Sequence, residues 1–164
     1  MKKGRKKIIN WLFEKSQTIY TRYFKKNKPW EIRKLDLLKY SADSLGNHLG
    51  QFLEVNGFEL IPKVERHDVY HVITNYGINA EDEIALQYLC FGNGKRSLYL
   101  FAVIILGTII LPDYLKYYYD SYCIGKKANA FYHYDFSKLL EVPLSDFRQF
   151  IFRKKYYFNY NQKT

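Results

Sequence analysis

Apolar residues recur at intervals of three and four along most of the chain, and few runs alternate strictly between apolar and polar residues. The first pattern is typical of one buried helical face, whereas strict alternation is typical of a strand. The sequence therefore predicts an all-α protein, folded as a single compact helical domain. We expect helices at residues 6–24, 30–40, 44–57, 66–74, 79–92, 98–111, 112–122, 136–140 and 144–152.

Capping and turn residues lie at the ends of these predicted helices. Asp43 or Ser44 is expected to cap the third helix. An Asn-Tyr-Gly turn at residues 75–77 separates the two helices on either side of it. Pro112 is expected to begin a later helix and Gly125 to end it.

The longest apolar run covers residues 98–111. As a helix it would be about 21 Å long. The hydrocarbon core of a bilayer is roughly 30 Å thick, so the run is too short to span one. We therefore expect a buried helix of the protein core at these residues.

The charge is concentrated at the amino end of the chain. The 164 residues carry 26 Lys and Arg against 16 Asp and Glu, a net charge of +10, and 48% of them are hydrophobic, which excludes a disordered chain. Residues 1–28 contain ten of the basic side chains and a single acidic one, Glu14. We expect a basic amphipathic arm at residues 1–28 that binds an anionic membrane surface, followed by a helical body at residues 29–164.

The cysteines and the first apolar run indicate the cellular compartment of the protein. Cys90 and Cys123 are too few for a disulfide framework or a Cys-rich zinc site, which favours a reducing compartment. The apolar run at residues 8–13 is interrupted by Asn10 and is too short for an export signal. We expect a cytoplasmic protein that associates peripherally with the inner face of the cell membrane.

Two of the four histidines, His67 and His71, are four residues apart, with Asp68 beside the first. On a helix this spacing leaves the two imidazoles about 40° apart on one face, which is the geometry of a two-histidine metal site. Asp68 borders the same face and can either bind the ion or orient a ligand imidazole. Glu83 falls in the first turn of the next predicted helix, and a helical hairpin can bring it back beside the histidines.

A purely structural interpretation of the same residues stays open. The histidines can be ordinary solvated or hydrogen-bonded side chains, with Asp68 capping their helix. The acidic run at residues 81–83 can simply complement the dipole at a helix start.

The sequence His67-Asp68-Val69-Tyr70-His71, followed by eleven residues and Glu83, resembles the metal motif of the coenzyme Q (ubiquinone) biosynthesis protein family. Weaker similarities lie on both sides of the motif, and the resemblance covers residues 40–150. These similarities are Tyr40, Ser44-Leu45-Gly46, Phe52-Leu53, Tyr122, Gly125, Ala128, Pro143-Leu144 and Arg148. The chain departs from the family pattern at Ser41, where the family has Pro, and at Asn75, where it has Gly.

The resemblance implies a helical metal- and lipid-binding domain, with His67, Asp68, His71 and Glu83 as metal ligands and catalytic residues. Two imidazoles with carboxylates suit zinc, which we favour, and also iron, manganese or cobalt. The implied partner is a polyprenylated quinone precursor or related isoprenoid lipid. The implied role is oxidative decarboxylation of its headgroup or, alternatively, non-catalytic organisation of other quinone-biosynthesis enzymes. Homodimerisation is left open.

Two other classes of protein fit less well. Zinc peptidases share the histidine spacing but place Glu directly after the first His, where this chain has Asp68. The basic arm alone would suit nucleic acid, but no base-reading motif accompanies it, so we expect no nucleic-acid partner.

Overall fold

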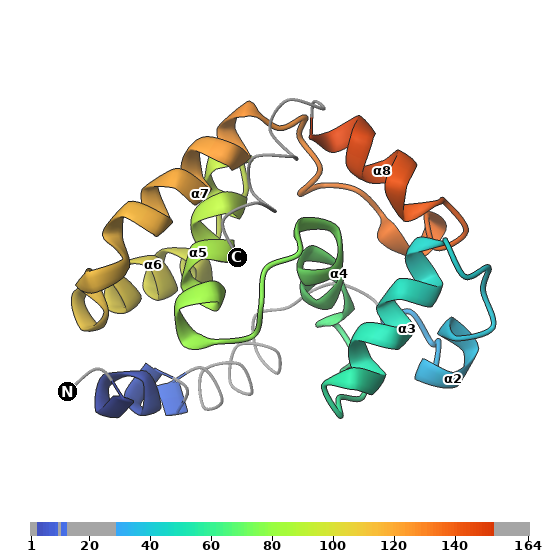
Figure 1. Ribbon diagram of the computed structural model, residues 1–164, viewed down its shortest axis with the longest axis horizontal. Coiled ribbons are helices and arrows are strands. Elements are labelled where there is room, and N and C mark those ends of the chain that lie inside the picture. Colours follow the sequence, from blue (N-terminus) through green and yellow to red (C-terminus); the bar gives the residue numbers. More distant parts are fainter. Residues whose placement is uncertain (1–2, 10, 13–28, 153–164) are drawn as a thin grey trace. The chain divides into compact units, whose positions relative to one another are not determined.

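A computed structural model describes residues 3–9, 11–12 and 29–152 of the chain (Figure 1). The all-α prediction is confirmed, because this part of the chain contains helices and no strand. Residues 3–9 and 11–12 are helical and are called the N-terminal helix below; the rest of the helix predicted at residues 6–24 lies outside the described residues. The later helices are α2 (Lys34–Leu37), α3 (Leu45–Val55), α4 (Glu65–Thr74), α5 (Ala80–Gly92), α6 (Leu98–Ile110), α7 (Leu115–Lys127) and α8 (Leu144–Ile151), with 3₁₀ turns η1 (Pro112–Tyr114) and η2 (Phe136–Lys138).

The chain divides into two compact units, each built from two separate segments. Unit 1 comprises Met1–Lys25 and Tyr76–His133, and unit 2 comprises Lys26–Asn75 and Tyr134–Thr164. The predicted division into an arm at residues 1–28 and a body at residues 29–164 stays a prediction, because residues 13–28 lie outside the described part of the chain.

In unit 1, α5 and α7 lie side by side at very short range (Figure 1). A Cβ atom built on Gly92 would overlap the carbonyl oxygen of Tyr122, and one built on Gly125 would overlap that of Leu89. The two glycines therefore allow backbone contact between the helices. This corrects the prediction that Gly125 ends a helix: α7 continues to Lys127, and Gly125 is a packing position within it.

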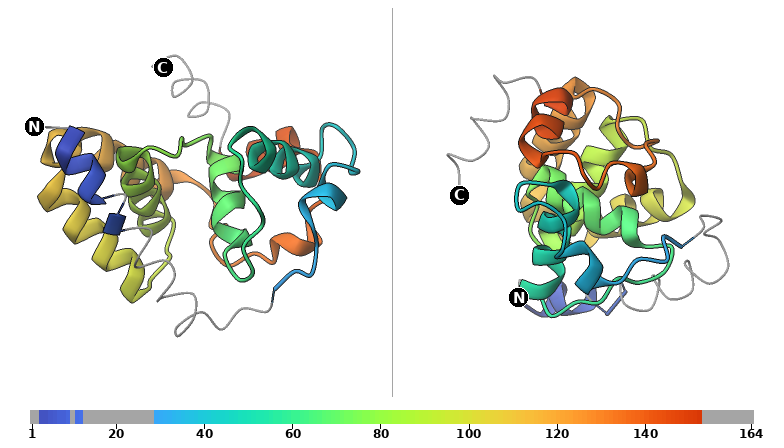
Figure 2. Two further views of the ribbon diagram at one scale, coloured as in Figure 1. Left: turned by 90° about the horizontal axis from the view of Figure 1, so that it is seen from below. Right: turned by 90° about the vertical axis from the view of Figure 1, so that its right-hand side faces the viewer.

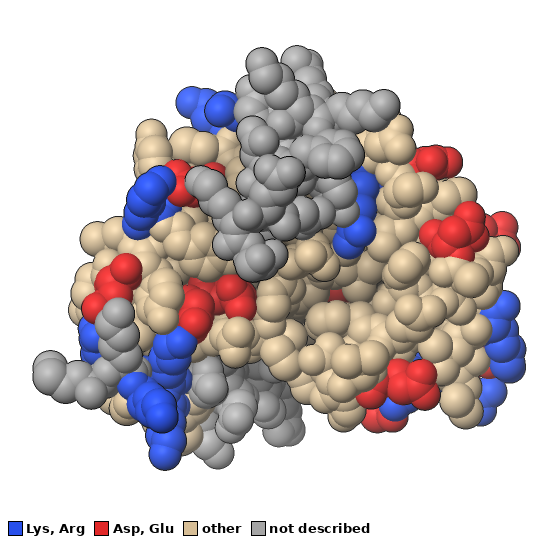
Figure 3. Space-filling model, viewed as in Figure 1, with Lys and Arg blue, Asp and Glu red and all other residues tan. Residues whose placement is uncertain are grey.

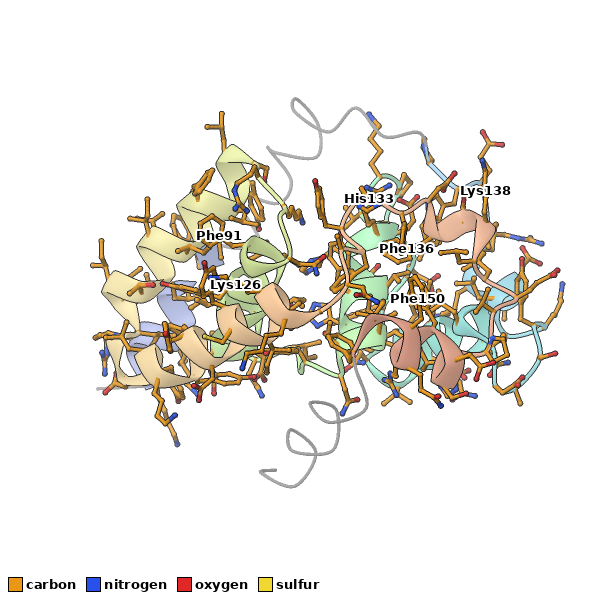
Figure 4. The ribbon with its side chains drawn as sticks, turned by 90° about the horizontal axis from the view of Figure 1, so that it is seen from above. Phe91, Lys126, His133, Phe136, Lys138 and Phe150 are labelled. Atoms are coloured by element: carbon orange, nitrogen blue, oxygen red, sulfur yellow. The ribbon has the colours of Figure 1, made fainter. Side chains whose placement is uncertain are left out.

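Unit 2 packs α3 and α8 against α4, the helix that carries the paired histidines (Figure 2). Tyr70 of α4 meets the ring of Phe136 edge-on at 5.8 Å, and Phe136 in turn meets Phe147 of α8 at 6.0 Å. Phe136 lies in the interior of this unit (Figure 4). At the start of α3 the Ser44 hydroxyl accepts from the backbone N–H of Asn47, so Ser44 is the helix cap, one of the two predicted candidates.

The helix predicted at residues 30–40 is reduced to the four residues of α2. Glu31 has a φ of 57°, in the left-handed region that a helix cannot include. The backbone N–H of Trp30 donates to the carboxylate of Glu65 at 3.2 Å. A contact between residues far apart in sequence therefore overrides the local helical preference.

The prediction of a buried core helix at residues 98–111 is wrong for half of the helix surface. Leu100, Val103 and Gly107 are buried against the rest of unit 1. The opposite side of α6 is exposed and apolar, and Leu98 and Ile109 keep 78% and 70% of their surface accessible. Among the described residues no single helix is long and apolar enough to cross a membrane, although α6 and the segment Pro112–Lys127, bent by 101°, meet the length and composition requirement together.

Candidate metal centre

Helix α4 is fixed at its carboxyl end by two local devices. Asn75 adopts a left-handed conformation with φ 59° and ψ 27°, and its N–H donates to the carbonyl oxygen of His71 at 2.8 Å. Arg148 of α8 donates to the carbonyl oxygens of Val72 and Ile73, at 2.6 and 3.2 Å. These contacts satisfy carbonyls that a helix end leaves without intrahelical partners, so the last turn of α4 is held in place.

The two imidazoles of α4 face each other closely. The Nε2 atoms of His67 and His71 are 3.2 Å apart, and the rings meet edge-on with centroids at 4.7 Å and an interplanar angle of 86°. Two nitrogens bound to one tetrahedral ion at about 2.0–2.1 Å would lie roughly 3.3–3.4 Å apart. The pair therefore has nearly the separation that a shared ion requires. Two neutral imidazoles can also share one hydrogen at this distance, depending on their tautomers.

Phe52 of α3 orients one of these rings. Its ring is stacked on that of His71 with centroids 5.5 Å apart and an interplanar angle of 13°. His71 is buried, with 3% of its surface exposed, whereas His67 is half-buried. The stacking restricts the His71 ring to an orientation in which its Nε2 atom points to His67.

Asp68 lies on the same helix and is half-buried. Ideal helical geometry places it about 60° from His71 and about 100° from His67 around the helix axis. It therefore borders the histidine face, and its predicted role as a ligand or as a hydrogen-bond partner of a ligand stays a prediction.

Glu83 lies in the first turn of α5, in unit 1. Helix α5 uses two faces within that unit: Ile84, Tyr88 and Phe91 contact α6, and Leu89 and Gly92 contact α7. Phe91, labelled in Figure 4, belongs to the first of these faces. Helical geometry places Glu83 and Gln87 on a third face, within about 40° of each other. Among the described residues His67, His71 and Glu83 each offer one ligand atom for a metal ion.

Sequence reasoning missed two features of these helices. The Arg148 contacts to α4 join residues that are 75 and 76 positions apart, and no local sequence pattern predicts them.

The second feature is Gln87, which is 3% exposed and whose Oε1 atom has no hydrogen-bond partner among the described residues. In the sequence, the only signal for Gln87 was its position one helical turn after Glu83. A buried amide oxygen without a partner is costly, so its presence calls for an explanation.

The fold and the site define an all-α protein with a histidine pair of metal-ligand geometry on one helix. No family model matches the chain, and no curated protein matches it. The chain is similar in structure to a protein from Nostoc punctiforme PCC 73102 that is provisionally described as a ubiquinone biosynthesis protein, with a TM-score of 0.64 and 18% sequence identity. The match covers 92% of this chain and 78% of that one. At this identity the similarity concerns the fold.

Proposed function

We propose that the chain binds one divalent metal ion through His67 and His71, completed by Glu83 and assisted by Asp68. We further propose that the site acts on a polyprenylated quinone precursor or related isoprenoid lipid at the membrane surface. The 3.2 Å separation of the two Nε2 atoms is the observation that carries the proposal. The motif resemblance and the similarity in fold to a protein named for ubiquinone biosynthesis support the substrate class.

Each residue of the proposed site has a role that follows from its chemistry. His67 and His71 supply neutral nitrogen ligands, and the stacked Phe52 ring holds His71 in its orientation. Glu83 supplies a carboxylate from the first turn of α5. Two or three protein ligands leave coordination positions for a substrate oxygen, and a bound ion there would polarise a carboxylate or phenol oxygen of the headgroup. Zinc is the favoured ion, with iron, manganese or cobalt as the redox-active alternatives.

The proposed reaction is oxidative decarboxylation of the headgroup. The ring carboxyl leaves as CO₂, and a hydroxyl group takes its place on the same carbon. With water as the source of the hydroxyl oxygen, the exchange releases two protons and two electrons from the substrate as a whole. It therefore requires a two-electron oxidant as a second substrate, and molecular oxygen in that role would leave as hydrogen peroxide. A non-catalytic scaffold that holds the same lipid for other quinone-biosynthesis enzymes is the alternative, and it requires no oxidant.

Metal content tests the first part of the proposal. The full-length chain and the variants His67→Gln and His71→Gln would be analysed by mass spectrometry of the elements, with His133→Gln as the matched control from unit 1. We expect close to one ion per chain in the wild type and control, and at least a tenfold loss in the two site variants. Equal metal content in all four proteins would overturn the metal site.

Product formation separates the enzyme from the scaffold. Purified protein would be incubated with a prenylated hydroxybenzoate that carries ¹⁴C in its carboxyl group, and released ¹⁴CO₂ would be counted. Release by the wild type that falls at least a hundredfold in Glu83→Gln supports catalysis. Lipid that co-purifies with the wild type without any release supports the scaffold.

A further inference from the structure

Helix α6 presents an exposed apolar side that the packing of unit 1 does not use. We call this side the α6 outer face, and it comprises Leu98, Phe101, Ile105, Leu106 and Ile109, which are 78%, 38%, 57%, 47% and 70% exposed. The spacing of these residues places them within about 140° around the helix, opposite the buried Leu100, Val103 and Gly107.

The composition of α6 is unusual for a helix in contact with water. A surface helix normally carries charged or polar residues on its outer side. Residues 98–110 contain no charged side chain. An exposed apolar patch of this kind marks a surface that binds a membrane or another protein. From Leu98 to Ile109 the face is about 16 Å long, or about three helical turns.

Basic side chains are attached at the carboxyl end of α6. Arg5 of the N-terminal helix donates to the carbonyl oxygen of Ile110 at 3.2 Å and pairs with Asp113 at 2.7 Å. These contacts fasten the N-terminal helix to α6, and Lys3 and Lys7 on that helix are exposed. Lys and Arg side chains gather over the N-terminal helix, at the lower left of Figure 3.

A tryptophan and an arginine add to this arrangement. Trp11 of the N-terminal helix is 57% exposed, and tryptophan is enriched at the boundary between lipid headgroups and hydrocarbon. At the amino end of α6, Arg96 is exposed, and its guanidinium lies over the Phe91 ring at 4.2 Å. The α6 outer face therefore has cationic groups at both ends of its helix.

Unit 1 as a whole is positively charged, like the groups at the ends of α6. Its described residues include nine Lys and Arg against five Asp and Glu, a net charge of +4. The described residues of unit 2 include seven Lys and Arg against ten Asp and Glu, a net charge of −3. Attraction to an anionic lipid surface would therefore act on the unit that carries the α6 outer face.

We propose that the α6 outer face inserts into the headgroup and upper acyl region of an anionic phospholipid bilayer, while the cations of the N-terminal helix bind the lipid phosphates. This inference rests on the membrane part of the proposed function and places the hydrophobic contact on α6 rather than on the basic arm alone. It is independent of the metal centre. The occupant is an anionic lipid bilayer because unit 1 combines this exposed apolar face with the exposed cations Lys3, Lys7 and Arg96, and buried apolar area and attraction to anionic lipid both add to binding at a membrane surface.

Vesicle binding by the full-length chain tests the proposal. Sedimentation with vesicles of phosphatidylcholine and phosphatidylglycerol (7:3) would be compared for the wild type and for Ile105→Gln/Ile109→Gln. Because both isoleucines are exposed, the variant should keep its fold. We expect at least a tenfold weaker partition coefficient for the double variant. Leu35→Gln/Val55→Gln, at exposed apolar positions of unit 2, is the matched control and should bind as the wild type does.

Two outcomes would overturn the proposal. One is unchanged vesicle binding by the Ile105→Gln/Ile109→Gln variant. The other is a shift from dimer to monomer in this variant with vesicle binding intact, which would assign the face to a second copy of the chain. Metal content measured on the same variant should equal that of the wild type. If the variant loses vesicle binding but keeps its metal, the α6 outer face is supported whether or not the proposed metal site is correct.

Discussion

Arg148 Nη2 donates a 2.6 Å hydrogen bond to the carbonyl oxygen of Val72, the residue that follows His71 on α4. A second bond from the same guanidinium reaches Ile73, so one side chain of α8 holds the last turn of the histidine helix. The paired imidazoles depend on the position of this helix. The Arg148 contacts therefore connect the packing of unit 2 to the candidate metal centre.

Removing the guanidinium should loosen this end of the helix. We expect Arg148→Met to lower the free energy of unfolding by about 1.5–3 kcal/mol, because a charged donor is lost from half-buried carbonyls. Metal affinity should also fall, since the last turn of α4, which carries His71, is held less firmly. Urea denaturation and metal titration measure the two effects. Arg148→Lys, which keeps the charge but not both bonds, should fall between wild type and Arg148→Met; indistinguishable stabilities would show that the contact is unimportant.

The glycine contact between α5 and α7 should be sensitive to a single methyl group. In Gly125→Ala the new Cβ meets the rigid backbone of Leu89, so we expect a loss of about 3 kcal/mol or more in the free energy of unfolding. Gly4→Ala is the matched control, because Gly4 is also helical and a Cβ built on it would have no heavy atom within 4 Å. Thermal denaturation of the two variants should show a clearly larger loss for Gly125→Ala. Equal losses would mean that the backbone contact is not limiting.

Helix caps and helical spacing could be predicted correctly from the sequence, because neighbouring residues determine them. The hydroxyls of Ser44 and Ser97 cap α3 and α6, and Asn75 takes the left-handed conformation expected of a residue that replaces Gly. The spacing of the histidines predicted their common face correctly, because it depends only on helical geometry.

Features that depend on distant residues could not be predicted in this way. The non-helical conformation at Trp30 follows from its contact with Glu65, and the Phe52 ring reaches His71 only after α3 has packed on α4. The outer face of α6 was missed for a different reason. Periodicity identifies an apolar helix, but it contains no information on whether both of its sides are covered.

His48 of α3 should make the stability of the protein depend on pH. Burial lowers its pKa below the ordinary value of 6.5, and the nearby Arg148 lowers it further, while Asp43 acts in the opposite direction. The unfolded chain therefore takes up a proton at a higher pH than the folded chain does. The stability from neutral His48 is complete above pH 6.5 and is lost as the pH falls through the lower folded value.

Comparison with a variant isolates this contribution. Between pH 7 and pH 5 the free energy of unfolding should fall more steeply for the wild type than for His48→Gln. Arg148→Met should show an intermediate slope, because burial still acts on His48 after the charge is removed. Urea denaturation at several pH values measures these slopes. Parallel curves for wild type and His48→Gln would exclude His48 as the titrating group.

The buried amide of Gln87 should lower the free energy of unfolding of the protein. Its amide oxygen is buried without a hydrogen-bond partner among the described residues, and such an acceptor costs roughly 1–3 kcal/mol. We expect Gln87→Met, which keeps the side-chain length, to raise the free energy of unfolding by about 1 kcal/mol. Gln51→Met, at an exposed position where the amide donates to Asn47 at 2.6 Å, is the control and should not stabilise the protein. Denaturant midpoints that rank the two variants in reverse would contradict this assignment.

Metal binding should also appear as thermal stabilisation. An ion that binds only the folded chain stabilises it by about 2.7 kcal/mol when the free ion is at 100 times its Kd. For a chain of this size that corresponds to a rise in Tm of roughly 5–10 °C. Differential scanning calorimetry with added zinc, then with a chelator, should show a reversible shift of this size in the wild type and in His133→Gln. The shift should be absent in His67→Gln and His71→Gln, because each removes one of the two nitrogens that lie 3.2 Å apart. A full shift in either site variant would mean that zinc binds elsewhere on the chain.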